Sequence, residues 1–444
     1  MLPLRMLPWA CLFLTAFAVI FDGQDWPQWN GPTREGLLPK DFIAKPIPKS
    51  GLELSWKAEV GYGYSGPVVS NDQVFISDYL LESGKITNNA GSRDRLTGKE
   101  RLVCFDAKSG KQLWAIASER KYSLSYPGGP RAAPLVVDGT VLSLGAEGDL
   151  SCHSIEKNGK ILWERTLAKD YKTEKPMWGY AAVPLVIGDQ LICLAGGQGS
   201  LVVSLDRKTG KELWRALSSD EIGYCPPALI SYGGVSQLLI WSPEKISSLN
   251  PMNGELYWEQ PFKPDYGMSI SPPILRGDLL FASGEGISAM FKLSSNPPNA
   301  SVVWQGDAKK SLGLSNTAAI FDDGYVYGAD FQSGALICVR QDDGTRMWQT
   351  ALPTTGANRE RGLSNAAAYL IKADNSNYYM LSETGDFISA KLTPKGYEET
   401  GRFHAIDPTN SSGGRKVLWT FPAIANGCLF VRNDEELRCF KLPN

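Results

Sequence analysis

Histidine is almost absent from this chain of 444 residues, which contains only His153 and His404. A zinc site built on histidine ligands, or a Ser-His-Asp triad, is therefore poorly supported. Basic clusters are missing too: the formal net charge is −2, and lysine and arginine are scattered along the sequence. Because a nucleic-acid-binding surface needs a basic patch or stripe, we expect no nucleic-acid partner.

The sequence also lacks adjacent cysteines and CxxC pairs, and so lacks the spacing of common metal and redox motifs. Cys104 and Cys338 each lie six residues before a turn glycine in a repeated unit, where a third copy has Ser204. His153 shares this spacing with Gly159. Such variation is typical of small buried positions, so we expect packed thiols and a packed histidine here.

Only one long apolar run is present, from Met6 to Phe21, preceded by Arg5 and followed by polar residues. A membrane span needs about 20 apolar residues, so the run is short for one. Its layout is that of a secretory signal, with an uncleaved anchor as the alternative. We therefore expect residues 1–23 to be a signal peptide and the chain to be exported to the periplasm, cell envelope or extracellular space. No membrane span is expected after its removal.

Helical periodicity is missing as well, whereas turn formers are abundant, with 45 glycines and 28 prolines. A turn, a strand and a terminal tryptophan recur instead. Five copies have glycine four residues before tryptophan, namely Gly110 with Trp114, Gly159 with Trp163, Gly210 with Trp214, Gly254 with Trp258 and Gly344 with Trp348. Degenerate copies end at Trp304 and Trp419, and Trp56 ends an isolated strand. The glycine supplies the positive φ of a hairpin turn, and the tryptophans are expected to pack between sheets.

A second repeated unit is an alternating apolar hairpin that starts at a proline or alanine. Its copies begin at Pro67, Pro134, Pro184, Pro227, Pro273, Ala319, Ala368 and Ala423. Eight hairpins match eight tryptophans, at a period of roughly 40 to 50 residues that is typical of a propeller. The sequence therefore predicts an all-β fold: an eight-bladed β-propeller of four-stranded antiparallel blades over 52–444, preceded by a lead segment, 24–51.

The phase of the repeats predicts how the ring closes. The strand that ends near Trp56 should complete the blade that begins with the hairpin at Ala423, which removes two exposed sheet edges. Two stretches, 80–100 and 393–414, interrupt the rhythm and are interpreted as insertions.

These motifs resemble known proteins. The DxxxGxxxW copies are similar to the tryptophan-docking repeats of pyrroloquinoline quinone (PQQ) dehydrogenases. The opening DWPQWNGPTREG, followed in order by SYPGGPRAAP, PMWGYAAVP, GYCPPA, YGMSISPP and LTPKGYEE, resembles the secreted bacterial PQQ-binding-like β-propeller repeat proteins of the quinoprotein alcohol dehydrogenase-like superfamily. The resemblance runs from Asp25 to the C-terminus and implies the fold, but not an activity.

In the extended segments that lead into the inner strands, side chains at alternate positions point toward the central channel. The residues three before the hairpin starts are Tyr64, Arg131, Ala181, Tyr224, Ile270, Asn316, Asn365 and Thr420. We predict a ligand pocket at one channel mouth, formed by Tyr64, Arg131, Trp178, Tyr180, Tyr224, Tyr266, Asn316 and Asn365. Its aromatic rings would stack on a ligand and Arg131 would balance a carboxylate. The alternative is a water-filled channel whose polar lining is merely hydrated.

Three functions remain open. The resemblance implies PQQ held with Ca²⁺ by carboxylate and amide oxygens, but the channel phase offers Asn316 and Asn365 and no acid. We therefore favour a non-catalytic binding or scaffold protein of the cell envelope, like the propeller subunit of the outer-membrane protein assembly machinery. Its partner would be an envelope protein, a glycan or a small molecule, bound by a monomer. The alternatives are a PQQ-dependent alcohol or sugar dehydrogenase and a carbohydrate-binding propeller; no catalytic or metal-binding residue is assigned.

Overall fold

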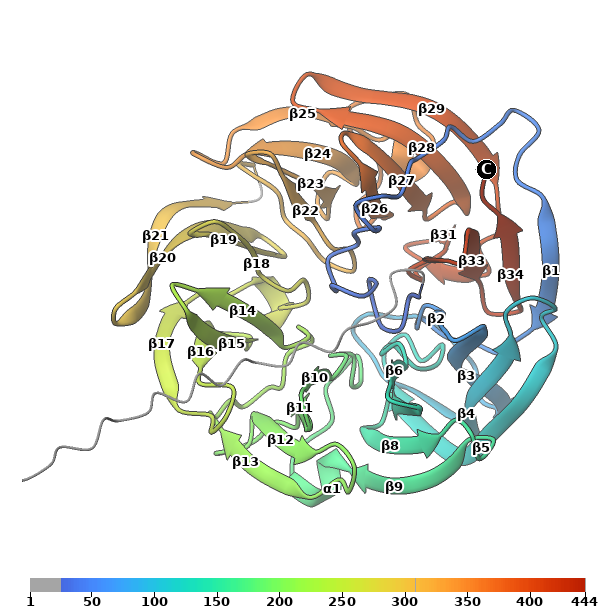
Figure 1. Ribbon diagram of the computed structural model, residues 1–444, viewed down its shortest axis with the longest axis vertical. Helices are drawn as coiled ribbons and strands as arrows, with labels where there is room; N and C mark the ends of the chain where they lie inside the picture. Colours follow the sequence, from blue (N-terminus) through green and yellow to red (C-terminus); the bar gives the residue numbers. More distant parts are fainter. Residues whose placement is uncertain (1–24, 308, 444) are drawn as a thin grey trace, which may run out of the picture.

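The computed structural model describes residues 25–307 and 309–443, so the expected signal peptide, 1–23, lies outside the described residues. The described chain forms eight four-stranded antiparallel sheets, arranged as blades in a ring (Figure 1). The predicted eight-bladed β-propeller is confirmed. In these ranges no helix is long and apolar enough to cross a membrane.

Each blade runs from an inner strand at the axis to an outer strand at the perimeter. Blades 1 to 4 are β2 (Val68–Ser70), β3 (Gln73–Ser83), β4 (Asp94–Asp106) and β5 (Gln112–Leu124); β6 (Leu135–Val137), β7 (Thr140–Leu144), β8 (Asp149–Ser154) and β9 (Lys160–Thr166); β10 (Leu185–Ile187), β11 (Gln190–Leu194), β12 (Val202–Asp206) and β13 (Glu212–Ala216); and β14 (Ala228–Tyr232), β15 (Val235–Trp241), β16 (Lys245–Leu249) and β17 (Leu256–Pro261). Two short helices, α1 (Leu167–Tyr171) and α2 (Leu352–Thr355), lie in connections.

Blades 5 to 7 repeat this order, and blade 8 is assembled from both ends of the described chain. They are β18 (Ile274–Arg276), β19 (Leu279–Gly284), β20 (Ile287–Ser295) and β21 (Pro298–Asp307); β22 (Ile320–Asp322), β23 (Tyr325–Asp330), β24 (Ala335–Arg340) and β25 (Arg346–Thr350); β26 (Ala368–Asp374), β27 (Asn377–Ser382), β28 (Asp386–Thr393) and β29 (Gly396–His404); and β32 (Ala423–Ala425), β33 (Cys428–Arg432), β34 (Glu436–Lys441) and β1 (Leu54–Glu59). As predicted, β1 closes the ring by pairing with β34, with Trp56 opposite Cys439.

A buried polar network lies at this closure, between blades 8 and 1. The Arg432 side chain is fully buried and donates hydrogen bonds to the carbonyl oxygens of Ser77, Gly61 and Asn433. On the same strand as Ser77, the buried Asp78 carboxylate accepts two hydrogen bonds from Arg101, at 2.8 and 2.6 Å. A buried guanidinium is costly unless its donors are satisfied, and here the closing backbone segment satisfies them.

All eight outer strands contain a β-bulge one residue before the position that docks on the next blade. The pairs that follow each bulge are Cys104 opposite Trp114, Cys152 opposite Trp163, Ser204 opposite Trp214, Ser248 opposite Trp258, Met290 opposite Trp304, Cys338 opposite Trp348, Ser389 opposite Gly401 and Cys439 opposite Trp56. Two predictions are corrected: the docking tryptophan of blade 2 faces Cys152, one residue before His153, and blade 7 has glycine where a tryptophan was expected. His153 is nevertheless buried, and the seven described cysteines form no disulfide.

The eighth tryptophan, Trp419, was therefore assigned wrongly to the docking repeat. A Cβ on Gly401 would lie 2.3 Å from the carbonyl oxygen of Ile47, because the lead segment fills the space of an indole ring there. The expected insertion 393–414 contains β29 and then β30 (Asn410–Ser412), which forms a small hairpin with β31 (Arg415–Val417). The stretch 80–100 simply lengthens the hairpin of β3 and β4.

The repeated turn glycines are needed for space as well as for backbone conformation. Gly210 has a φ of +70°, and a Cβ there would lie 2.7 Å from the indole ring of Trp163, which docks from the preceding blade. The Trp163 indole N–H donates to the carbonyl of Arg207 in the same turn, at 2.9 Å. The Trp163 ring thus packs against Gly210, and its indole N–H is hydrogen-bonded to the backbone of the same turn.

We expect Gly210→Ala to lower the free energy of unfolding by about 2–4 kcal/mol, because it adds a clash to the strain of a left-handed backbone. Gly188→Ala in the same blade is the matched control, since Gly188 has a φ of +59° but an added methyl group would meet nothing within 4 Å. It should lose only about 1–2 kcal/mol. Denaturant unfolding of both variants measures the difference, and equal losses would mean that the docked indole tolerates the methyl group.

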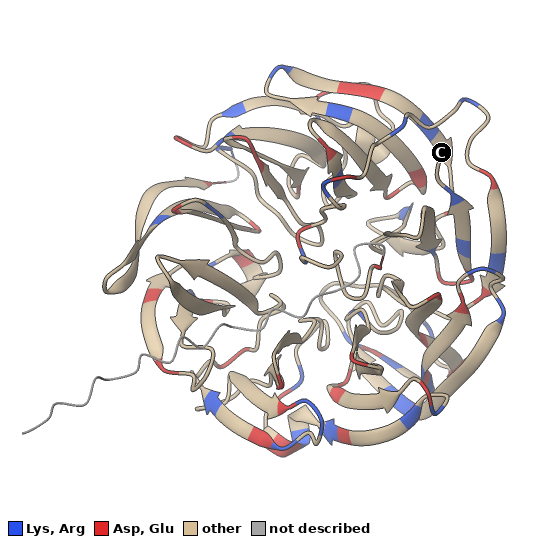
Figure 2. Cartoon of the chain, in the orientation of Figure 1, with Lys and Arg blue, Asp and Glu red and all other residues tan. Residues whose placement is uncertain are grey.

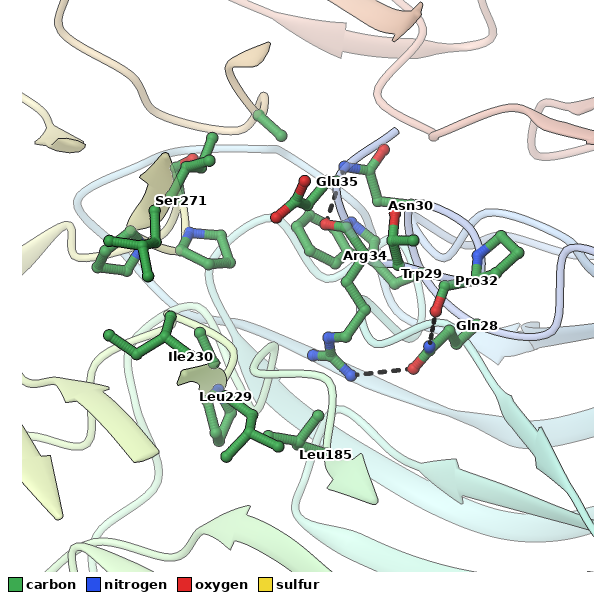
Figure 3. A pocket seen from close by; sticks show the side chains of 18 of the residues that line it. Gln28, Trp29, Asn30, Pro32, Arg34, Glu35, Leu185, Leu229, Ile230 and Ser271 are labelled. Atoms are coloured by element: carbon green, nitrogen blue, oxygen red, sulfur yellow. Dashed lines mark hydrogen bonds between the residues drawn. The ribbon is translucent and has the colours of Figure 1, made fainter. Parts of the chain in front are cut away.

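The lead segment crosses the middle of the ring, where it passes next to β26 (Figure 1). Trp26 pairs with Val69 of blade 1, and the carbonyl of Pro27 accepts from Val136 of blade 2. The segment then reaches blades 3, 5 and 7 through three further contacts: Arg34 donates to the Val183 and Pro184 carbonyls, Glu35 pairs with Arg276 at 2.6 Å, and Leu38 bonds to Lys372. Its side chains enclose a small cavity of about 430 Å³ with inner-strand residues such as Leu229 and Ile230, and Arg34 contacts Gln28 inside it (Figure 3).

Candidate functional site

A larger cavity of about 1080 Å³ occupies the centre of the ring on the other side of the lead segment. The segments that enter the inner strands line it, together with turns between the second and third strands of several blades. Trp29 lines both cavities, and its ring meets Phe421 edge-on at 5.4 Å between centroids. Because Trp29 lies between the two cavities, it forms part of the floor of the larger one, which opens through the loops.

Seven of the eight predicted pocket residues line this one cavity. They are Tyr64, Arg131, Trp178, Tyr224, Tyr266, Asn316 and Asn365. Ala181 and Ile270, which also lie three residues before a hairpin start, line it too. Thr420 does not: it is buried, and its hydroxyl donates to the Arg432 carbonyl. In seven blades, therefore, the residue three before the hairpin start lines the cavity.

Tyr180 is the predicted residue that the structure does not bring to the cavity. It is 3% exposed and packs in the core shared by blades 2 and 3, against the turn at Gly148. Its hydroxyl lies 3.4 Å from that of Thr173. Since Ala181 lines the cavity, the alternation of an extended segment turns Tyr180 to the opposite side.

The Arg131 guanidinium is held by the protein itself. It donates to the carbonyl oxygens of Ser125, Tyr126 and Gly129 and lies 5.2 Å from the centroid of the Tyr64 ring. Burial lowers the pKa of Arg131 from its usual value. These contacts tie the guanidinium to one loop, so Arg131 holds the backbone of 125–129 in place.

Aromatic rings form much of the wall. Trp178 and Tyr224 meet edge-on, with centroids 5.6 Å apart. Tyr266 differs from them, because it is 78% exposed and has a left-handed backbone, with a φ of +53°. Non-glycine residues in this region are strained, and strain that persists is concentrated at functional sites.

Several cavity residues were not predicted from the sequence. Trp29, Trp419, Phe331 and Phe421 add aromatic surface. Glu285 adds a carboxyl group from the turn between β19 and β20, between two glycines. The signal that could have found Glu285 is this turn, because turns between second and third strands lie on the same face as the loops that enter the inner strands.

Glu285 is an unusual acid. It is only 6% exposed, and in the described part of the chain its carboxyl group forms no hydrogen bond or ion pair. Burial, helped by the nearby charge of Asp265, raises the pKa of Glu285 to about 7. A carboxyl group with this environment exists in both protonation states near neutral pH.

The residues present do not fit PQQ held with Ca²⁺. Ca²⁺ takes six to eight oxygen ligands, several of them carboxylates. Within 25–307 and 309–443, no three histidine, cysteine or acidic side chains converge as a metal site. Arg131, the residue expected to balance the cofactor's carboxylates, already donates to three backbone carbonyls.

Comparisons with known proteins agree with the fold. The family model described as "Outer membrane protein assembly factor BamB" matches residues 98–350, more than half of the chain. A search of the curated proteins by sequence finds no significant match.

Solved structures show the same architecture at low sequence identity. BamB from Moraxella catarrhalis is 14% identical, with a TM-score of 0.56 over 88% of this chain and 97% of that one. The quinohemoprotein alcohol dehydrogenase ADHIIG from Pseudomonas putida HK5 is 12% identical, with a TM-score of 0.50 over 95% and 80% of the two chains. The computationally designed Ika8 protein is 11% identical, with a TM-score of 0.52 over 88% and 100%. These likenesses extend to the fold alone.

Proposed function

This chain belongs to the family described as outer membrane protein assembly factor BamB, and on that basis we propose that it is a non-catalytic binding protein of the cell envelope. It is exported by the segment 1–23 and works as a monomer after its removal. Its partner is an envelope protein, a segment of which enters the open side of the ring.

The observation that carries this proposal is the shape of the ring interior. The lead segment lies over one side of the axis, and the loops of the other side line the 1080 Å³ cavity. Nine of the residues that line it are aromatic, and the exposed side chain of Tyr266 is one of them. Concave, largely apolar sites with a few polar groups are the usual binding sites of proteins.

The distribution of charge favours recognition at the cavity rather than by the outer surface of the ring. Lysine and arginine alternate with aspartate and glutamate around the outer strands (Figure 2). Such interspersed charges keep a surface soluble without attracting one class of partner. The recognition we propose is therefore confined to the cavity and its loops.

Photo-crosslinking tests this function. A benzoyl-phenylalanine in place of Tyr266 should yield a discrete protein adduct in the envelope fraction of cells that produce the protein. The same probe at Leu213, which is 53% exposed on an outer strand, is the matched control. We expect at least several-fold more adduct from position 266, because only that position faces the cavity. Equal yields, or an adduct from position 213 alone, would overturn the proposal.

A carbohydrate ligand is the second candidate, and the edge-on pair of Trp178 and Tyr224 favours it, since aromatic faces bind sugar rings. The dehydrogenase alternative gains no such support from the cavity's donor set. Cross-linking separates the first two candidates, because a glycan partner leaves no protein adduct at position 266.

A further inference from the structure

Glu285 is the feature of the cavity that packing does not explain. The residue is more than nine-tenths buried and lines the cavity, and its carboxyl group has no hydrogen-bond or ion-pair partner in the described chain. Burying a carboxyl group without a partner destabilises a protein, and such groups persist where they serve a site.

The fold places a second carboxylate beside it. The Asp265 backbone N–H donates to the Glu285 carbonyl at 2.9 Å, which ties the two loops together. A Cβ on Gly286, whose φ is +74°, would lie 2.2 Å from an oxygen of the Asp265 carboxylate. Glycine at 286 therefore leaves the room that the Asp265 side chain occupies, next to Glu285.

An exposed ring completes the arrangement. Tyr266 follows Asp265 directly and is held in its strained backbone by the turn 265–267, where the Met268 N–H donates to the Asp265 carbonyl at 3.0 Å. Aromatic faces attract cations as carboxylates do. The strained backbone thus holds an exposed aromatic side chain at the cavity, on the same loop as Asp265.

Acids outnumber bases on this side of the cavity. Glu221 and Glu244 line the neighbouring loops together with Lys263, and none of the three forms an ion pair in the part of the chain described. On the other side, the basic groups are already engaged. Lys175 pairs with Glu147, and Arg93 donates to the carbonyls of Ser123 and Lys175.

We propose that Glu285, Asp265 and Tyr266 form a receptor for a basic side chain of the protein partner. The lysine ammonium or arginine guanidinium group lies between the two carboxylates, and Tyr266 packs along the cation or its alkyl stem. This rests on the proposed function in one respect, the polypeptide nature of the ligand. A cavity of 1080 Å³ favours a polypeptide, because a small free amine would leave most of its aromatic wall uncovered.

The arrangement makes binding depend on pH. Asp265, Lys263, Glu244 and Glu221 are charged groups on the surrounding loops, and Asp330 lies behind Gly313, where it pairs with Arg346. Asp265 is the group that acts on the pKa of Glu285. A bound cation favours the carboxylate form, so binding lowers the Glu285 pKa below 7 and releases a proton. Affinity for the cation should fall as the pH decreases below about 7.

The test uses a minimal probe, N-acetyl-lysine methylamide, and its side-chain-acetylated neutral analogue. Calorimetry should detect saturable binding of the charged probe alone. Glu285→Gln and Asp265→Asn should each weaken it about ten-fold or more, since each removes a charge-assisted hydrogen bond. The carboxyl carbon resonance of Glu285 should titrate at a lower pH with the probe present, a shift that a purely structural glutamate would not show.

Glu255→Gln is the matched control, because Glu255 is an exposed acid on the opposite face, between β16 and β17. Its affinity should equal that of the unchanged protein. Binding that survives Glu285→Gln, no saturable binding of the charged probe, or displacement of the probe by CaCl₂ at equal concentration would each overturn the receptor. A cross-linked protein at position 266 without probe binding leaves the proposed function standing, whereas probe binding without any adduct removes the protein partner and keeps the cation site.

Discussion

Replacement of Arg432 by methionine should lower the free energy of unfolding by about 3–5 kcal/mol. The methionine fills most of the volume but cannot donate to the carbonyls of Ser77, Gly61 and Asn433. It also leaves the buried Asp434 without the positive charge that opposes the rise of its pKa. The loss is large because these groups join the first and last blades.

Denaturant unfolding followed by tryptophan fluorescence measures this loss. Arg340→Met is the control, because Arg340 forms an ion pair with Asp343 in which both side chains are more than 40% exposed. Exposed pairs contribute about 0–1 kcal/mol, so this variant should unfold nearly as the unchanged protein does. A loss at position 432 no larger than that at position 340 would show that ring closure does not depend on the guanidinium.

Glu285→Gln should stabilise the protein, and more so at higher pH. The folded-state pKa of about 7 lies above the value of about 4.3 for an unfolded glutamate, so the folded protein binds the proton more tightly. Raising the pH from about 5 to about 8 removes that proton and costs the unchanged protein about 2 kcal/mol, which the glutamine variant does not lose.

The measurement is a pair of unfolding curves for each protein, one at each pH. The gain should be small near pH 5 and largest near pH 8, with Glu255→Gln showing neither change. A gain that is equal at both pH values would contradict a shifted pKa and indicate a packing effect. Stability gained with binding lost is the trade-off expected of a site that keeps an unpaired charge.

The repeats made the architecture predictable from the sequence, because each blade carries the same turn and strand signals. Much of the cavity lining was predictable too, since the residue three before each hairpin start lines the cavity in seven blades, as with Arg131 and Asn316. Counting tryptophans failed at Trp419, since the space of the missing indole at Gly401 is filled by Ile47, distant in sequence. That substitution of one segment for another has no local signal.

Glu285 escaped prediction for a different reason. Its turn looks like any other surface turn, and acids in turns usually cap their own backbone. Burial and the lack of a partner arise only when the loop at Asp265 folds over it. Tyr180 and Ala181 show the opposite case, in which strict alternation, applied residue by residue, would have separated the core side chain from the cavity side chain.

The pairing of β1 with β34 also has a consequence for how the chain folds. Leu54 pairs with Phe440 although almost the whole described sequence lies between them, so the partner strand of β1 follows all seven other blades along the chain. Contacts this distant in sequence are slow to form, since the intervening chain must be ordered first. Seven blades can therefore assemble in succession along the emerging chain, while β1 waits as an unpaired edge until the final strand arrives. The ring passes from open to closed in one late step, and that step brings Arg432 into the backbone that buries it.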